Sequence, residues 1–286
     1  MHLRTLLGDH PCTAALKDGT VKSDSVTLDY TEYSPTNKGF KPMVNEAAFD
    51  VSEMAIVTYL TAKSFGKPMV LLPSVVVARF QHGHAVYREA LGDLKPGDLE
   101  GKRVGIRSFT TTTGAWLRGI LANDYGVNLD KVNWITFEDA HVAEFRDTTV
   151  RAPQGKQIIP MLLDGDLDAV LGEKVERSGL KPLFPNAAAE EKSWFAKHGV
   201  VPINHMVVVS TALSNSHPDA VREVFRLLQQ SAALTPADAK PALPKFSREE
   251  MGRSLALISE YCAQQGLIPR RFTVDEMFDD LTRTLR

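Results

Sequence analysis

Short apolar runs rich in β-branched residues alternate along this chain with segments of helical period, and no internal repeat interrupts them. Examples of the apolar runs are KRVGIRS at 102–108, VNWITF at 132–137 and VVPINHMVVVSTAL at 200–213. The run at 68–80 contains a proline, which predicts two short strands or one broken strand. This alternation is typical of βα units that build mainly parallel sheets, so we predict an α/β fold.

The composition excludes several classes of protein. A formal net charge of -2 with no long Lys/Arg run gives no electrostatic footprint for nucleic acid or for an anionic membrane. No stretch approaches 18 apolar residues, so no membrane partner is expected. Cys12 and Cys262 are the only cysteines, too few for a disulfide framework. A small molecule is therefore the expected partner, and homo-oligomerisation is left open.

The first residues, MHLRTLLGDH, contain no seven-residue apolar core of the kind a secretory signal requires. We therefore expect a cytoplasmic protein, or a periplasmic one if a leader preceded residue 1. Motifs such as GxxxxGK[ST], GxGxxG and GxSxG are missing from the sequence, so nucleotide binding and serine hydrolysis are not expected.

The order of the elements predicts two lobes joined by two crossings. A first strand-helix series ends near residue 85, a second follows, and the chain returns near residue 207 before terminal helices. This order resembles the type II periplasmic-binding-protein fold, in which the ligand lies in a cleft between lobes. The expected lobes are 1–85 with 208–286, and the inserted 86–207. Such a fold would bring residues 81–86 close to residues 204–208.

Three strand ends carry residues that could hold an anion. Ser52 is expected to cap a helix running from Glu53 to Ser64, and Glu53 suits the positive end of that helix. Arg107 precedes a second helix start, where it could clamp a carboxylate. Glu173 follows a third strand. The second helix start also carries four threonines, Thr110, Thr111, Thr112 and Thr113. Their hydroxyls could donate hydrogen bonds to a carboxylate, or one of them could simply cap the helix.

The stretch RFQHGHAVYRE at 79–89 contains two histidines around a glycine. Arg79 begins the first crossing and is a plausible carboxylate ligand, and His82 is expected to lie beside His205 on the second crossing. A metal clip of His82 and His84 is the rival interpretation, because residues two apart on a strand point the same way. That site needs a third ligand, and no HExxH or cysteine cluster supplies one. We therefore predict no metal.

Several strings narrow the resemblance to the 4,5-dihydroxyphthalate decarboxylase family. They occur in order between about residues 45 and 230, and the most specific are FDVSEM at 49–54, RF-x-H at 79–82, and the H-M-V-V-V strand at 205–209. Weaker ones are LEGKRVGI at 99–106 and DGDLDAVLG at 164–172. The resemblance implies a cytosolic, cofactor-independent enzyme that removes one carboxylate from a dihydroxylated aromatic diacid.

Within that interpretation His82, His205 and Glu53 are the expected catalytic residues. Decarboxylation of a hydroxyarene needs a proton delivered to the ring carbon, and an imidazole can supply it near neutral pH. Ser52, Arg79, Arg107, the four threonines and Glu173 are the expected substrate ligands.

The sequence departs from the family's pattern at positions expected in the cleft, which leaves a different substrate open. Gln81 replaces a commonly basic residue, and Arg107-Ser108 replaces a proline and an acidic residue. A solute-binding protein for an aromatic or other carboxylate, feeding a transporter or sensor, is the main alternative function. A cofactor-free lyase of menaquinone precursor synthesis is a weaker one.

Overall fold

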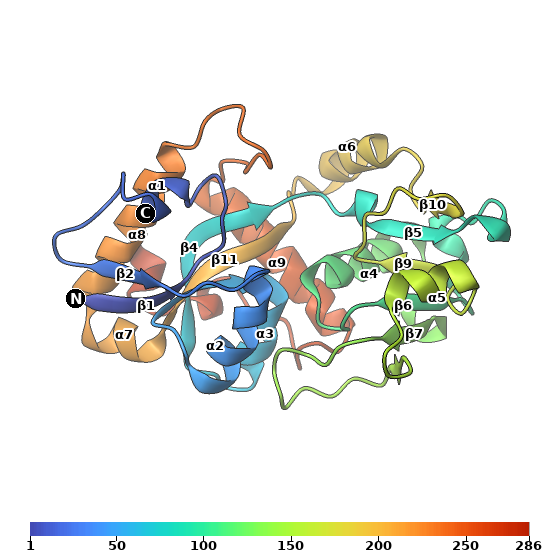
Figure 1. The fold of residues 1–286 in the computed structure, drawn as a ribbon, viewed down its shortest axis with the longest axis horizontal. Coiled ribbons are helices and arrows are strands. Elements are labelled where there is room, and N and C mark those ends of the chain that lie inside the picture. Colours follow the sequence, from blue (N-terminus) through green and yellow to red (C-terminus); the bar gives the residue numbers. More distant parts are fainter. Residues whose placement is uncertain (286) are drawn as a thin grey trace.

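Two β-sheets lie side by side in a computed structural model of the chain, which describes residues 1–285 (Figure 1). The first sheet has five strands in the order β2-β1-β3-β11-β4, and we call the half of the molecule around it lobe I. Its strands are β1 (His2–Leu6), β2 (Thr27–Tyr30), β3 (Val51–Ala55), β4 (Met69–Ala78) and β11 (Ile203–Ser210).

The second sheet has six strands in the order β10-β5-β9-β6-β7-β8 and forms lobe II. Its strands are β5 (Ala85–Arg88), β6 (Arg103–Ile106), β7 (Asn133–Thr136), β8 (Val150–Arg151), β9 (Ala169–Leu171) and β10 (Leu180–Pro182). In both sheets the βα units pair in parallel, while the strands that carry the crossings, β5 and β11, pair antiparallel. The α/β prediction is confirmed.

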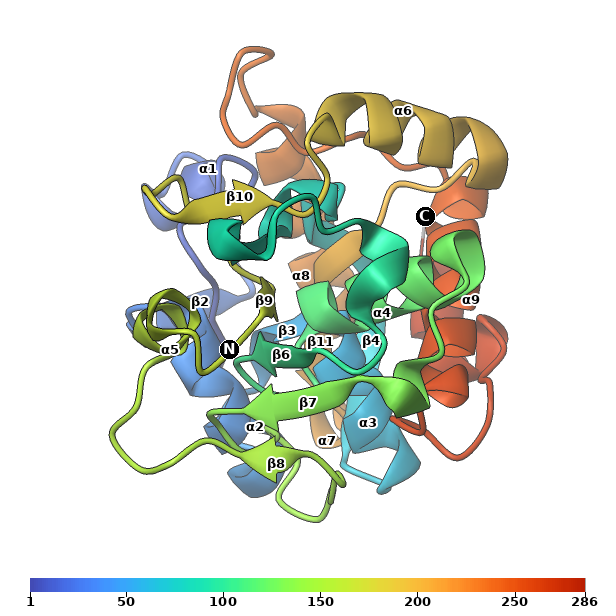
Figure 2. The same ribbon diagram turned by 90° about the vertical axis from the view of Figure 1, so that its right-hand side faces the viewer.

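Helices cover both sheets. Those that follow lobe I strands are α1 (Ala14–Lys17), α2 (Phe40–Glu46), α3 (Ile56–Ser64), α7 (Thr211–Ser216), α8 (Pro218–Ala233) and α9 (Arg248–Gln264). Those of lobe II are α4 (Thr112–Tyr125), α5 (Ile158–Asp164) and α6 (Ala187–His198). Helix α9 begins at a capping box in which Ser247 and Glu250 each accept the other's backbone N–H, and the helix packs against α4 of lobe II (Figure 2).

The chain crosses between the lobes twice, and the two crossings lie side by side as predicted. The first leaves β4 through residues 79–84, and the second joins α6 to β11. Arg79 N–H donates to the Pro202 carbonyl over 3.0 Å, and the Gln81 amide donates to Asn204 Oδ1 over 2.8 Å. The second crossing enters the lobe I sheet at Ile203, ahead of the expected boundary at 208.

Two local predictions near the cleft are wrong. Ser52 does not cap a helix, because β3 continues through Ala55 and α3 begins only at Ile56. All five residues of β3 are buried in the middle of the sheet, and pairing with both β1 and β11 favours the extended backbone there. His82–His84 form a 3₁₀ turn rather than a strand, so their rings do not share a face by the rule of alternation. Within residues 1–285 no helix is both long and apolar enough to span a bilayer.

Candidate functional site

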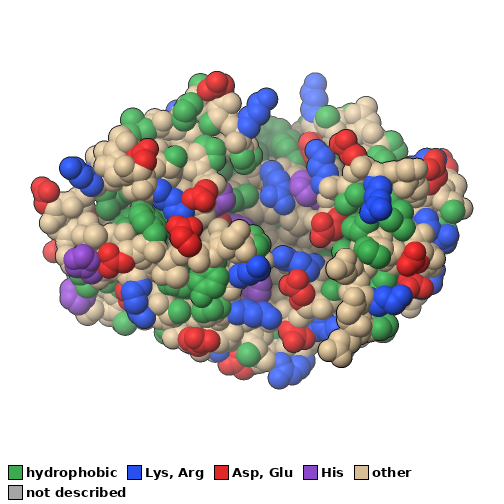
Figure 3. Space-filling model, in the orientation of Figure 1, with side chains coloured by type: hydrophobic (Ala, Val, Ile, Leu, Met, Phe, Trp, Pro, Cys, Tyr) green, Lys and Arg blue, Asp and Glu red, His purple; other side chains and the backbone are tan. Residues whose placement is uncertain are grey.

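A cleft with a volume of about 360 Å³ opens between the two lobes, and basic and histidine side chains are visible inside it (Figure 3). This volume is within the range of small-ligand sites. The side chains that matter below come from both lobes and from both crossings. They are His10, Thr36, Glu53, Thr58, Arg79, Arg107, Thr111, Thr112, Thr113, His141, Glu173, Asn204 and His205.

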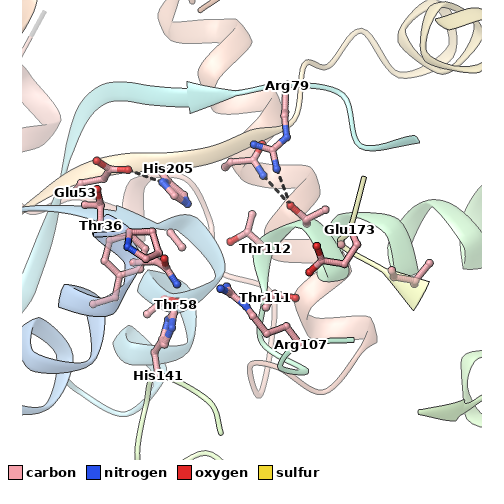
Figure 4. A pocket seen from close by; sticks show the side chains of 18 of the residues that line it. Thr36, Glu53, Thr58, Arg79, Arg107, Thr111, Thr112, His141, Glu173 and His205 are labelled. Atoms are coloured by element: carbon pink, nitrogen blue, oxygen red, sulfur yellow. Dashed lines mark hydrogen bonds and ion pairs between the residues drawn. The ribbon is translucent and has the colours of Figure 1, made fainter. Parts of the chain in front are cut away.

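At the lobe I wall, one buried carboxylate is held between two histidines. Glu53 lies on β3, where the neighbouring strand β11 brings His205 beside it, and His205 Nδ1–H donates to Glu53 Oε1 over 2.6 Å (Figure 4). The turn after β1 brings in His10, whose Nε2 lies 2.9 Å from Glu53 Oε2. The backbone N–H of Gly8 donates to the same oxygen over 2.8 Å. We call His10, Glu53 and His205 the His–Glu–His trio.

The contacts of the trio keep Glu53 ionised. Burial alone raises the pKa of Glu53, but hydrogen bonds from His10 and His205 outweigh it and hold that pKa well below its usual range. An ionised carboxylate can only accept hydrogen bonds, so each histidine donates to it and keeps its other ring nitrogen for the cleft. The trio can therefore hold and release protons next to a ligand.

Two arginines bring positive charge into the cleft from opposite sides (Figure 4). The Arg79 guanidinium has no carboxylate within 4.0 Å among residues 1–285, and within that range it donates only to Thr113 Oγ1, over 3.3 Å. Arg107 has one distant partner, Glu138, at 3.8 Å, and both side chains of that pair are solvent-exposed. An arginine without a close internal partner is available to a ligand carboxylate, and its planar fork favours a bidentate contact.

Two helices begin at the cleft without a side-chain cap from their own N-cap residue. At the start of α4, Thr111 occupies the N-cap position, but its hydroxyl donates to the Ser108 carbonyl and leaves the first-turn N–H groups free of a cap. At the start of α3, Val57 N–H donates across the lobes to Thr112 Oγ1 over 3.2 Å. The positive ends of two helices thus point into a cleft that also holds two arginines, which suits a ligand with more than one negative group.

The structure places the predicted threonines in two groups. Thr111, Thr112 and Thr113 line the cleft, whereas Thr110 is buried beneath it with its hydroxyl 3.3 Å from Ser108 Oγ. Glu173 lines the cleft from lobe II as expected, and burial raises its pKa. Ser52 is buried in β3 and donates to the Glu53 carbonyl, so it contacts no ligand space.

His82 does not face His205, and that prediction is wrong. Its side chain turns into the interior of lobe II, where its ring packs edge-on against Phe184 at 5.0 Å and Trp194 at 6.3 Å between centroids. It is absent from the cleft lining, and neither of its ring nitrogens has a hydrogen-bond partner. The backbone of the 3₁₀ turn sets this direction. Within residues 1–285, no three His, Cys, Asp or Glu side chains gather as metal ligands.

His141 also lines the cleft, although the sequence does not single it out. Its Nδ1 lies 2.9 Å from Thr58 Oγ1, and Phe40 packs edge-on between its ring and that of His205. Burial, together with nearby Arg107 and Lys41, lowers its pKa to about 4, so it is neutral near pH 7. It lies in an irregular segment after β7, where no periodicity in the sequence indicates which way a side chain points.

Comparison with known proteins confirms the resemblance seen in the sequence. Two curated relatives are both named 4,5-dihydroxyphthalate decarboxylase. The one from Comamonas testosteroni is 25% identical over 250 residues, which cover 82% of this chain and 76% of the relative. The one from Pseudomonas putida is 27% identical over 184 residues, which cover 61% of this chain and 71% of the relative. No family model matches the chain.

Solved structures confirm the two-lobed periplasmic-binding-protein fold. The periplasmic aliphatic sulphonate binding protein SsuA of Escherichia coli aligns over 98% of this chain and 92% of its own, with a TM-score of 0.59 and 11% identity. A point mutant of the desulfurization enzyme DSZB, in complex with biphenyl-2-sulfinic acid, aligns over 99% of this chain and 98% of its own, with a TM-score of 0.57 and 12% identity. The fold therefore occurs in both a binding protein and an enzyme.

Proposed function

We propose that the chain decarboxylates a hydroxylated aromatic dicarboxylate such as 4,5-dihydroxyphthalate, without a cofactor. The observation that carries the proposal is the His–Glu–His trio in a cleft that is otherwise built to attract anions. The similarity to two proteins named for this activity supports the choice of substrate class.

The arginines and the helix starts would hold the substrate. Arg79 and Arg107 approach from opposite sides, so each can take one carboxylate, with the N–H groups of the α4 start adding hydrogen bonds. Binding the two carboxylates separately fixes the ring against lobe I, where His205 presents its free Nε2. Holding the ring beside His205 makes the proton transfer between them effectively unimolecular, which is a large part of catalysis.

The chemistry then needs one proton at one ring carbon. The ring hydroxyl para to the departing carboxylate supplies electron density, and His205 Nε2–H⁺ protonates the carbon that carries this carboxylate. The bond between the ring and the carboxylate breaks, its electron pair restores the aromatic ring, and carbon dioxide leaves. The net reaction consumes one proton, which solvent returns to His205. Because the substrate's own hydroxyl stabilises the intermediate, the residues of the cleft need only position groups and move a proton.

The main rival is a solute-binding protein for a small carboxylate, a role for which the same fold is used. Arg79, Arg107 and the helix starts already supply what an anion needs for binding alone, and a buried carboxylate held between two histidines adds nothing to that binding. The trio has a clear purpose only if its protons are used. This argument favours the enzyme.

The test is carbon dioxide release from 4,5-dihydroxyphthalate, with substrate affinity measured in parallel by calorimetry. His205→Gln should lower kcat by about 100-fold or more while affinity changes little, because general acid catalysis is lost. His217→Gln, at an exposed histidine on the lobe I surface, is the matched control and should keep full turnover. Tight binding without turnover in the unaltered protein would favour the solute-binding alternative.

A further inference from the structure

Glu53 has two histidine partners, although the proposed reaction uses only one imidazole as its acid. Each carboxylate oxygen is occupied, Oε1 by His205 and Oε2 by both His10 and the Gly8 N–H. The Glu53 side chain is 1% exposed, while His10 and His205 are 19% and 25% exposed. Both histidines are thus reachable from the cleft, and the carboxylate between them is not.

The second histidine matters at the moment when His205 gives away its proton. From then on, neutral His205 no longer balances the charge of Glu53, and a buried carboxylate without a cationic partner is costly. Besides the two histidines, the Cys12 thiol lies within reach of the charge of Glu53, and burial raises the pKa of that thiol to about 11. Neither that neutral thiol nor the Gly8 N–H can supply a positive charge.

We propose that His10 is a positioning residue that carries a positive charge for Glu53 throughout turnover, so that His205 can release its proton. The inference rests on the proposed function. With His10 as imidazolium, the trio passes from a net charge of plus one to zero when His205 donates. With a neutral His10, the net charge of the trio would pass from zero to minus one next to an anionic substrate. The charge on His10 therefore makes His205 the stronger acid.

Two features of the structure fit this role. The Gly8 N–H and His10 Nε2 meet at the same carboxylate oxygen, so the turn after β1 is shaped around Glu53. Within that turn, the His10 N–H is held by Thr13 Oγ1 over 3.1 Å, and Thr13 in turn donates to the Gly8 carbonyl over 2.8 Å. A turn that merely followed a strand would need neither of the two contacts with Glu53, which lies 43 residues beyond His10 in the chain.

The inference is tested by the pKa of His205, read from its ring signals by NMR in ligand-free protein. His10→Gln keeps a hydrogen-bond donor but removes the charge, and it should raise the His205 pKa by about one unit. In the same variant kcat should fall by about 10-fold or more with KM changed less, and the pH profile of kcat should shift upward. His10→Lys, which restores a cation, should recover part of both losses.

His2→Gln is the matched control, because His2 forms a similar pair with Asp29 on the surface, at 3.1 Å. It should leave the His205 pKa unchanged. If His10→Gln does not fold, the unaltered protein still decides the matter, since two histidines coupled through one carboxylate titrate in two linked steps. Independent single-step titrations, or an unchanged His205 pKa in His10→Gln, would overturn the inference. If the proposed function itself is wrong, the unaltered protein will show no turnover, which distinguishes that failure from the failure of this inference.

Discussion

Gly8 is a position where one added methyl group should disturb the His–Glu–His trio directly. A Cβ atom placed on Gly8 would lie 2.7 Å from His10 Nε2, 2.8 Å from Glu53 Oε2 and 2.8 Å from Thr36 Oγ1. Contacts this short force a shift, and the atoms in the way are those of the trio and a cleft threonine. The Gly8 backbone has no left-handed φ angle, so Gly8→Ala introduces this steric conflict without backbone strain.

The expected magnitude follows from what must move. Glu53 is fixed by three donors in a buried position, so it cannot turn away without loosening hydrogen bonds to a charged group. Overpacking of a well-packed site costs about 1–3 kcal/mol of unfolding free energy. Misplacement of catalytic groups by about 1 Å lowers turnover by about 100-fold. We therefore expect a moderate loss of stability together with a large loss of kcat.

The assay is carbon dioxide release combined with thermal unfolding of the same samples. Gly252→Ala is the matched control, because a Cβ atom there meets nothing within 4 Å and the residue lies inside α9. It should stabilise the protein by about 0.5–1 kcal/mol and leave turnover unchanged. Full activity in Gly8→Ala would refute the assignment of the trio as the catalytic centre.

Three further predictions concern residues in and near the cleft. Arg107→Ala should raise KM by about 10-fold to 100-fold, since hydrogen bonds to a charged group contribute about 1.5–3 kcal/mol, and Arg107→Lys should recover only part of the loss. His82→Phe should keep kcat/KM within about threefold, because His82 has no polar partner and lies outside the cleft. A loss of kcat/KM as large as that in His205→Gln would show that His82 takes part in catalysis. His141 should stay neutral down to about pH 4, and because the unfolded chain binds that proton near pH 6.5, unfolding free energy should fall by up to about 3 kcal/mol as pH drops through this window. In His141→Gln that part of the pH dependence, followed by denaturant unfolding, should disappear.

The sequence predicted the architecture because element order and strand composition depend on local physics. The alternation of apolar runs with helical segments indicated the α/β class, and the order of elements indicated two crossings. The resemblance to the type II periplasmic-binding-protein fold placed those crossings together, as the contact between Gln81 and Asn204 confirms. Pro73 lies on the edge strand β4, between Leu71 and Val75, where the register with β11 shifts, so the run forms one irregular strand around the proline.

Side-chain directions in the turns could not be predicted in the same way. In a strand or helix the period gives the direction, but His82 lies in a 3₁₀ turn, and His10 and His141 lie in irregular segments. Their directions depend on contacts with distant parts of the chain. A helix dipole does not stabilise the charge of Glu53, because the structure shows this residue in a strand. Residues from β11 and from the turn after β1 hold its carboxylate instead.

The central claim is that His205 delivers a proton to the ring carbon that loses its carboxylate. The most direct measurement is turnover of 4,5-dihydroxyphthalate in D₂O, followed by NMR of the product. The account predicts 3,4-dihydroxybenzoate with one deuterium at the vacated carbon, para to the 3-hydroxyl, formed at least 100-fold more slowly by His205→Gln. Bound but unconsumed substrate, or a turnover rate that His205→Gln leaves unchanged, would contradict it.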